Sequence, residues 1–253
     1  MGGMASVFVV SDIHGHRDDL LEGLVEFGLA SEDGEWIGKP DAQLWILGDL
    51  TDRGPDGIGV VDLVMSLQEA APDQVHVLMG NHEALTLGMA RFPDSRFVDS
   101  WIINGGLLAD QVALTDRHLQ WLASLPLVAR FEDYLFLHSD TTSYLGWGSS
   151  VDEINETVRG IFASADDLDG HWDVWVKLTS RYHFARRGGT SAARTMLGAL
   201  GGKKIVHGHS IIGTLINRPS EEVSEPVQYA DGQVLAIDGG RYDGGPLLVV
   251  RLQ

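Results

Sequence analysis

The sequence predicts an α/β fold with a largely parallel sheet in its first half and more antiparallel β-structure in its second half. In the first half, three short apolar runs are each followed by a polar loop and a helical pattern. In the second half, short β-like runs alternate with turns. The 253 residues are 44% hydrophobic, which suffices for one large core or a compact domain with a cap. We therefore expect one domain over residues 1–253, because neither an internal repeat nor a long linker divides the chain.

The three β-α units occupy the first 90 residues. Apolar runs at 5–10, 43–47 and 75–79 have the length and β-branched content of buried strands. Strands that alternate with helices in this way form a parallel sheet, and the loops after the strands then share one edge. The helices that follow these strands are expected at 17–29, 58–70 and 84–90.

The remaining elements are less regular. Residues 92–123 are expected to be mostly helical, and 171–187 form an aromatic and basic patch. Segment 144–200 is a possible helical cap or substrate-groove segment. Further helices are expected at 151–162 and 190–200, and further strands at 127–131, 134–137, 204–206, 227–230, 233–237 and 247–252.

Composition narrows the classes of partner and site. The formal net charge of −18 repels polyanions, so nucleic acid is not expected as a general partner, although bound divalent metals can make a site locally positive. The chain has no cysteine, so a metal must be held by His, Asp, Glu or Asn. No apolar run approaches the roughly 20 residues of a membrane span. Residues 1–6 carry no Lys or Arg, so we expect a cytoplasmic protein without a signal peptide.

Polar side chains follow each strand of the first half. A strand-to-helix turn rich in Asp and Gly, such as 48–54, is also what ordinary turn chemistry produces. The repetition at three strand ends favours a site, and oxygen and imidazole donors suit divalent cations. In a site for two metals one carboxylate bridges the ions, and Asp49 on the central strand is the natural bridge. The converging residues are Asp12, His14, Asp49, Asp52, Arg53, Asn81 and His82.

These blocks resemble the signatures of a known family. Asp12-Ile13-His14-Gly15, Gly48-Asp49-Leu50-Thr51-Asp52-Arg53-Gly54 and Gly80-Asn81-His82-Glu83 are similar to the three signature blocks of calcineurin-like metallophosphoesterases. They are closest to the phosphoprotein phosphatase branch and its bacterial serine/threonine phosphatases. His138 after a hydrophobic strand, and Gly208-His209-Ser210, resemble the two later histidine motifs. The resemblance covers five blocks in order from residue 12 to residue 210.

The resemblance implies two packed mixed β-sheets flanked by helices, with a dimetal site at the sheet edge. Asp12 and His14 would bind the first metal together with Asp49. Asp49 would bridge to the second metal, and the ligands that complete it would be Asn81, His138 and His209. The cofactors would be two divalent ions, with Mn²⁺ as the default and Fe or Zn as alternatives.

The resemblance also assigns catalytic roles. Arg53 would hold the substrate phosphate with its guanidinium fork. His82 would be the general acid for the leaving oxygen, oriented by Asp52. A metal-bound hydroxide would attack directly, without a covalent enzyme intermediate. A second phosphate-binding arginine is implied before the helix that precedes the last histidine motif. Arg181 comes nearest to that spacing, with Arg186 and Arg187 as alternatives.

Several positions depart from the family pattern. Ser11 replaces a glycine, Thr51 a common valine, and Ser139-Asp140 the usual pair of glycines after His138. The last departure affects the expected shape of the substrate groove. Position 211 is Ile, so the extra first-metal histidine of the wider superfamily is missing, as in the phosphoprotein branch.

The function implied is hydrolysis of phosphate monoesters, with phosphoserine, phosphothreonine or a phosphotyrosine-like ester as substrate. The first alternative is a hydrolase of dinucleoside polyphosphates, such as diadenosine tetraphosphate, or of other small phosphoanhydrides. The second is a binding protein that has kept the fold and lost catalysis. The expected partner is a phosphorylated protein or a small phosphate ester, with no membrane partner; the sequence predicts no oligomeric state.

Overall fold

The first sheet contains the three parallel strands that the sequence predicts. In the computed structural model, which describes residues 5–252, its order is β3-β2-β1-β9. β1 pairs in parallel with β2, and β2 with β3, whereas β9 runs antiparallel at the edge beside β1. The strands span Ser6–Val10 (β1), Ala42–Ile46 (β2), Val75–Val77 (β3) and Val250–Arg251 (β9).

The second sheet is parallel in its centre and antiparallel only at its two edges. Its order is β4-β5-β6-β8-β7, with β5, β6 and β8 mutually parallel. The expectation of antiparallel structure in the second half therefore holds for the β4–β5 and β7–β8 pairs alone. The strands are Val128–Phe131 (β4), Tyr134–Leu137 (β5), Lys204–His207 (β6), Val227–Tyr229 (β7) and Val234–Ala236 (β8).

The two sheets pack face to face through a cluster of buried apolar side chains. Side chains alternate along β1, so Val7 and Val9 face the second sheet while Phe8 and Val10 face the helices. Between the sheets the rings of Trp45 and Phe136 stack with centroids 4.5 Å apart. This packing fixes the two sheets relative to each other, and so aligns the loops at their carboxyl edges.

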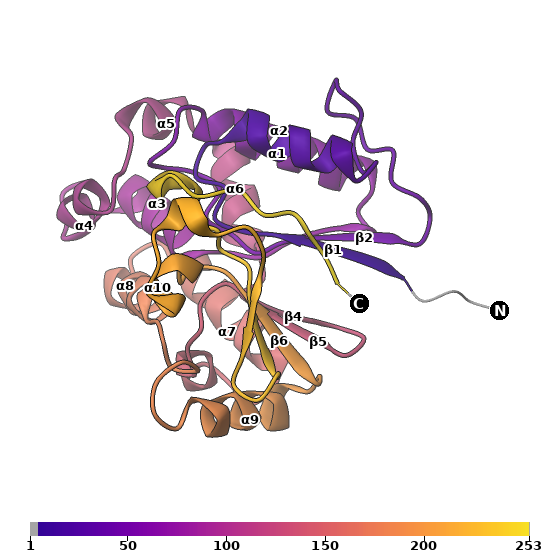
Figure 1. The fold of residues 1–253 in the computed structure, drawn as a ribbon. Helices are drawn as coiled ribbons and strands as arrows, with labels where there is room; N and C mark the ends of the chain where they lie inside the picture. Colours follow the sequence, from indigo (N-terminus) through magenta and orange to yellow (C-terminus); the bar gives the residue numbers. More distant parts are fainter. Residues whose placement is uncertain (1–4, 253) are drawn as a thin grey trace.

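Helices cover the outer faces of both sheets (Figure 1). α1 and α2 lie over the first sheet, and α7 and α9 lie on the side of the second, where their buried residues join the main core. The helices are α1 (Arg17–Glu26), α2 (Gly57–Ala70), α3 (Asn81–Arg91), α4 (Phe97–Ile103), α5 (Leu108–Ala113), α6 (Asp116–Ser124), α7 (Val151–Ala163), α8 (Leu168–Thr179), α9 (Gly189–Leu200) and α10 (Ile212–Ile216).

Two regions for which the sequence predicts no element bounds form helices. Residues 92–123 are mostly helical, as expected, and divide into three short helices, α4 to α6. The patch 171–187 is largely α8, whose start is capped by Asp167. Its buried face combines His171 with Val174 and Leu178, and the aromatic and charged residues around them hide this helical period. Within 144–200, α7 and α8 place buried side chains in the main core. Within residues 5–252, no helix is long and apolar enough to cross a membrane.

Candidate metal centre

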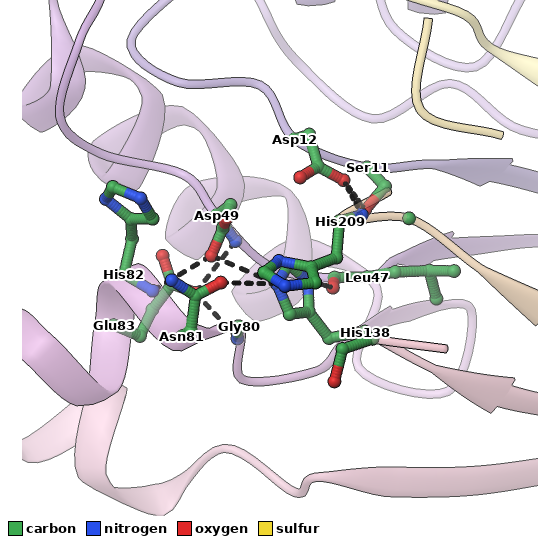
Figure 2. Close-up of polar contacts among 12 residues, drawn as sticks. Ser11, Asp12, Leu47, Asp49, Gly80, Asn81, His82, Glu83, His138 and His209 are labelled. Carbon is green, nitrogen blue, oxygen red and sulfur yellow. Dashed lines mark hydrogen bonds and ion pairs between the residues drawn. The ribbon is translucent and has the colours of Figure 1, made fainter. Parts of the chain in front are cut away.

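The residues expected at the site follow the carboxyl ends of five parallel strands. Asp12 and His14 come after β1, and Asp49 after β2. Asn81 and His82 open α3 just beyond β3, while His138 follows β5 and His209 follows β6. Because the two sheets are packed together, all these loops meet at one edge, with Asp49 between His82 on one side and the pair His138 and His209 on the other (Figure 2).

The backbone of these loops is held in an unusual conformation. The non-glycine residues with left-handed φ include Asp12, His14, Asp49, Asp52, Arg53 and His209. Such conformations cost on the order of 1–3 kcal/mol each and persist where the surroundings fix them. Here the loops bind one another: the amide of His14 donates to the carbonyl of Asp49 over 2.9 Å. A Cβ on Gly54 would come within 1.8 Å of the His14 carbonyl oxygen, so this close approach requires glycine.

Two groups of buried ligand atoms share Asp49. The donor atoms of Asp12, Asp49, His138 and His209 all lie within 4.8 Å of one another, as do those of His14, Asp49 and His82. Asp49 contacts both sides, because Oδ1 lies 3.3 Å from His138 Nε2 and Oδ2 lies 3.6 Å from His14 Nε2. Asp49 thus occupies the central position that a bridging carboxylate needs.

The other candidate donors lie beside these groups, in an arrangement that differs in part from the expected one. Asn81 Oδ1 lies 3.0 Å from His138 Nε2. Asp12, expected with His14, falls in the group of His138 and His209, while His82, expected as the acid, falls in the group of His14. The structure therefore brings together every residue of the expected metal site, and it places His82 within reach of the same centre.

Backbone carbonyls orient the imidazoles. His138 Nδ1 lies 2.8 Å from the Leu47 carbonyl, and His14 Nδ1 lies 3.0 Å from that of Thr51. In each ring, a proton on the bonded nitrogen leaves the other nitrogen with a lone pair toward Asp49, which is the arrangement that metal-ligating histidines adopt. His209 is held through Nε2, 3.1 Å from the Thr179 carbonyl, so its Nδ1 is the available donor.

Electrostatics of the centre favour a bound cation. Burial is the main cause that lowers the pKa of His14, His138 and His209, so these imidazoles are neutral as ligation requires. Burial and the neighbouring Asp12 raise the pKa of Asp49 well above its usual value, because two carboxylates share a desolvated space. Neutral imidazoles cannot balance the negative charge of these buried carboxylates, whereas divalent cations can. The donor set therefore fits metal ions that prefer nitrogen and oxygen ligands.

His82 and Asp52 form a buried pair. His82 Nδ1 lies 2.7 Å from Asp52 Oδ2, and the buried Nε2 has no hydrogen-bond partner among the described residues. Burial raises the pKa of Asp52 to about 7, and burial followed by the charge of Arg53 lowers that of His82. The carboxyl thus fixes the ring through one nitrogen and leaves the other without a hydrogen-bond partner among the described residues.

Arg53 is fixed from behind by a neighbouring loop. Its amide donates to the Gly105 carbonyl over 3.0 Å, and its Nε donates to the Asn104 carbonyl over 3.1 Å. Its guanidinium carbon lies 4.0 Å from the centre of the Tyr242 ring. Nη1 also lies 3.1 Å from His14 Nε2, so a cation bound at that nitrogen requires Arg53 to give up this contact.

Arg181 lies nearer to the centre than its two alternatives. Its positive charge is among the causes, after burial, that lower the pKa of His82, His138 and His209. Arg186 and Arg187 are exposed, whereas Arg181 is half-buried and lies two residues after Thr179, whose carbonyl is 3.1 Å from His209 Nε2. The backbone position thus favours Arg181 over the other two, and its role stays a prediction.

Glu83 is a contributor that the sequence reasoning left without a role. Its carboxylate accepts hydrogen bonds from the amides of Asp49, Leu50 and Gly80 at 2.8, 2.8 and 2.7 Å. Burial raises its pKa to about 7. The available signal was the acidic residue at the third position of a helix, where a carboxylate reaches back to the amide that precedes the helix. Glu83 therefore ties the loop after β2 to the start of α3.

Replacing Glu83 with Gln is expected to lower the free energy of unfolding by about 1–3 kcal/mol at pH 8, where the native residue is a carboxylate. The amide of Gln has one oxygen, so a buried backbone donor loses its partner. Urea unfolding of the two proteins measures the difference. Glu69, an exposed residue paired with Arg117, provides the control. An equal loss in the Glu69→Gln and Glu83→Gln variants would show that the three buried hydrogen bonds do not support the site.

Comparisons with known proteins agree with this geometry. The family model described as calcineurin-like phosphoesterase matches residues 5–213. Over 78 residues the chain is 38% identical to a symmetrical bis(5'-nucleosyl)-tetraphosphatase of Buchnera aphidicola, covering 31% of this chain and 24% of that protein. Over 94 residues it is 37% identical to the serine/threonine-protein phosphatase rdgC of Drosophila melanogaster, covering 37% of this chain and 13% of that protein. The matches thus span about a quarter or less of the length of these relatives.

A solved structure extends the likeness over nearly the whole chain. A cold-active protein tyrosine phosphatase superposes with a TM-score of 0.75 at 22% sequence identity, covering 99% of this chain and 74% of that one. At this identity the likeness concerns the fold. It confirms the fold class predicted from the sequence, two packed mixed sheets flanked by helices.

Proposed function

The chain belongs to the calcineurin-like phosphoesterase family, and we propose on this premise that it is a dimetal phosphatase that hydrolyses phosphate monoesters, with phosphoserine and phosphothreonine in proteins as its substrates. The observation that carries the proposal is the buried, Asp49-centred group with Arg53 and His82 beside it. A binding protein without catalysis has no need for a buried imidazole beside such a group whose second nitrogen has no hydrogen-bond partner among the described residues.

The proposed ligands divide into two sets. As the family pattern implies, Asp12 and His14 with Asp49 would hold one ion, and Asp49 would share the other with Asn81, His138 and His209. In the structure the carboxylate of Asp12 lies within reach of His138 and His209 as well. Two divalent ions, with Mn²⁺ as the first candidate, would withdraw charge from the phosphate and make a water nucleophilic near neutral pH. Asp49 is proposed as the bridge because its two oxygens face opposite histidines.

The other residues bind and protonate the substrate. Arg53 would hold the phosphate oxygens, and the neighbouring Asn104 and Gly105 carbonyls fix its direction. Burial raises the pKa of Asp52 to about 7, so near neutral pH a protonated Asp52 can donate to His82 Nδ1 and leave the proton of the neutral ring on Nε2. His82 Nε2 would donate a proton to the leaving oxygen, while Asp52 keeps the ring in place. Arg181 would supply the second guanidinium for the phosphate.

A second candidate is hydrolysis of dinucleoside polyphosphates, favoured because a relative named for that activity matches at 38% identity. Both reactions use the same centre. The cytoplasmic location and the single domain that the sequence predicts are the same for both candidate substrates. Both stay predictions.

Substrate preference separates the two candidates. With Mn²⁺ added, we expect phosphate release from phosphoserine and phosphothreonine peptides at a higher kcat/KM than turnover of diadenosine tetraphosphate. Treatment with a chelator is expected to abolish both activities, and added Mn²⁺ to restore them, because the proposed nucleophile depends on the metals. Turnover of the dinucleotide alone would exclude the protein-phosphatase proposal, and activity that survives chelation would exclude both.

A further inference from the structure

Asp140 connects three segments that meet at the candidate site. It is fully buried, two residues beyond His138. Its Oδ2 accepts a hydrogen bond from the amide of Tyr182 at 2.8 Å, and its Oδ1 accepts one from the Ser210 hydroxyl at 2.6 Å. Its backbone carbonyl accepts from the amide of His183 at 2.9 Å. A pair of glycines in place of Ser139-Asp140, as in the related motif, could not make the two side-chain contacts.

The bonds to Asp140 form a first tie on this segment, and hydrogen bonds between His183 and Thr142 form a second tie. His183 Nδ1 lies 3.2 Å from the amide of Thr142 and 3.1 Å from the Thr142 hydroxyl. Between the two ties, Tyr182 adopts a left-handed φ of +69°. For a large side chain this backbone conformation is unfavourable, so it persists because neighbouring bonds impose it. Residues 181–183 are therefore held by the loop that follows β5, rather than by a helix or strand of their own.

These bonds fix the backbone next to Arg181. The carbonyl of Thr179, two residues before Arg181, lies 3.1 Å from His209 Nε2, and the amide of Tyr182, one residue after it, donates to Asp140, so the backbone of Arg181 lies beside the centre. An arginine side chain is long and flexible, and its use in binding an anion depends on how firmly its backbone is placed. Because hydrogen bonds hold residues 182 and 183, they restrict the directions from which the Arg181 side chain can reach the site.

We propose that Asp140 is a positioning residue that holds Arg181 beside the centre through the backbone of Tyr182 and His183, and thereby sets the affinity of the site for the substrate phosphate. This inference rests on the proposed function, because a guanidinium held at this place acts on phosphate only if the site binds phosphate. The structure also gives a competing route, in which Asp140 acts through Ser210 on the neighbouring His209.

A double-mutant cycle distinguishes these routes. The Asp140→Ala, Arg181→Ala and doubly substituted proteins are prepared with Mn²⁺. Calorimetry then measures the Kd for inorganic phosphate, and turnover of p-nitrophenyl phosphate gives KM and kcat. We expect Asp140→Ala to raise the phosphate Kd and KM about tenfold with a much smaller change in kcat, since one charge-assisted contact is weakened. In the Arg181→Ala protein, adding Asp140→Ala should raise the phosphate Kd and KM by less than about twofold, because the residue through which Asp140 acts is absent.

The conservative variant gives a matched control. In Asp140→Asn, the amide oxygen can accept from the Tyr182 amide while the NH₂ group donates to the Ser210 hydroxyl, so the phosphate Kd should stay within about twofold of the unmodified protein. The exposed Glu69→Ala substitution controls for loss of a surface carboxylate. If Asp140→Ala does not fold, His183→Ala removes the second tie and enters the same cycle with the same expectation.

Three results would overturn the proposal. One is a tenfold effect of Asp140→Ala that persists without Arg181. Another is a loss of Mn²⁺ affinity in Asp140→Ala, which would place its action at His209. The third is an Asp140→Asn protein as impaired as Asp140→Ala. Failure of the proposed function is separate from these, because it would appear as absent phosphatase turnover in the unmodified protein, while calorimetry still measures whether Asp140 and Arg181 act together on phosphate.

Discussion

Replacing Asp49 with Asn is expected to lower kcat/KM for phosphate monoesters by about 10³-fold or more, since metal ions contribute several kcal/mol of charge stabilisation and each 1.4 kcal/mol is about tenfold in rate. Asp49 is the one residue common to both groups of candidate ligand atoms. Asn keeps the volume of the side chain but offers one neutral oxygen, so it cannot bridge two cations. The metal content of the purified variant should therefore fall from two ions per chain to one or none.

The matched control is Asp62→Asn, which alters an exposed carboxylate paired with His118. That variant should keep two ions and unchanged kinetics. Elemental analysis and steady-state kinetics of the three proteins give the comparison. An Asp49→Asn protein that retained both ions and near-normal turnover would show that Asp49 does not bridge the metals.

Replacing His82 with Asn is expected to lower kcat by about 10²–10⁴-fold, the usual contribution of a general acid, while two metal ions stay bound. The loss should depend on the leaving group. The serine oxygen of a phosphoserine peptide leaves as a poorly stabilised alkoxide and needs the proton, whereas the p-nitrophenolate released from p-nitrophenyl phosphate needs it far less. The smaller loss is therefore expected for p-nitrophenyl phosphate.

Metal content is decisive here, because His82 also lies within reach of His14 and Asp49 as a possible ligand. If the His82→Asn protein lost one ion, the histidine would be a ligand and the general-acid assignment would be wrong. His76→Asn is the control: this histidine lies on β3 and bonds Gln43 Oε1 at 2.8 Å, and its replacement should leave both metal content and kcat unchanged.

The parts of the molecule that the sequence predicted are those set by local pattern. Three apolar runs followed by helices define a parallel sheet, and the parallel order places Asp12 and Asp49 at one edge without any knowledge of tertiary contacts. The same reasoning brought Asn81 and His82 to that edge. The roles assigned to these residues stay predictions until the variants are measured.

What the sequence did not predict depends on contacts between distant segments. Asp140 bonds groups 42 and 70 residues away, and no local pattern signals such partners. The stacking of Tyr242 against Arg53 arises from the chain's return near its end. The helix α8 was missed because aromatic and charged residues interrupt its apolar period; its buried face becomes clear only when α3 packs against it.

Metal titration of phosphate release tests the central claim most directly. Protein stripped with a chelator is titrated with Mn²⁺ while release of phosphate from a phosphoserine peptide is followed, with the Asp49→Asn protein in parallel. The account predicts that activity appears with the metal, reaches its maximum near two equivalents per chain, and is absent from the variant. Full activity in the stripped protein, or equal activity in the Asp49→Asn protein, would contradict it.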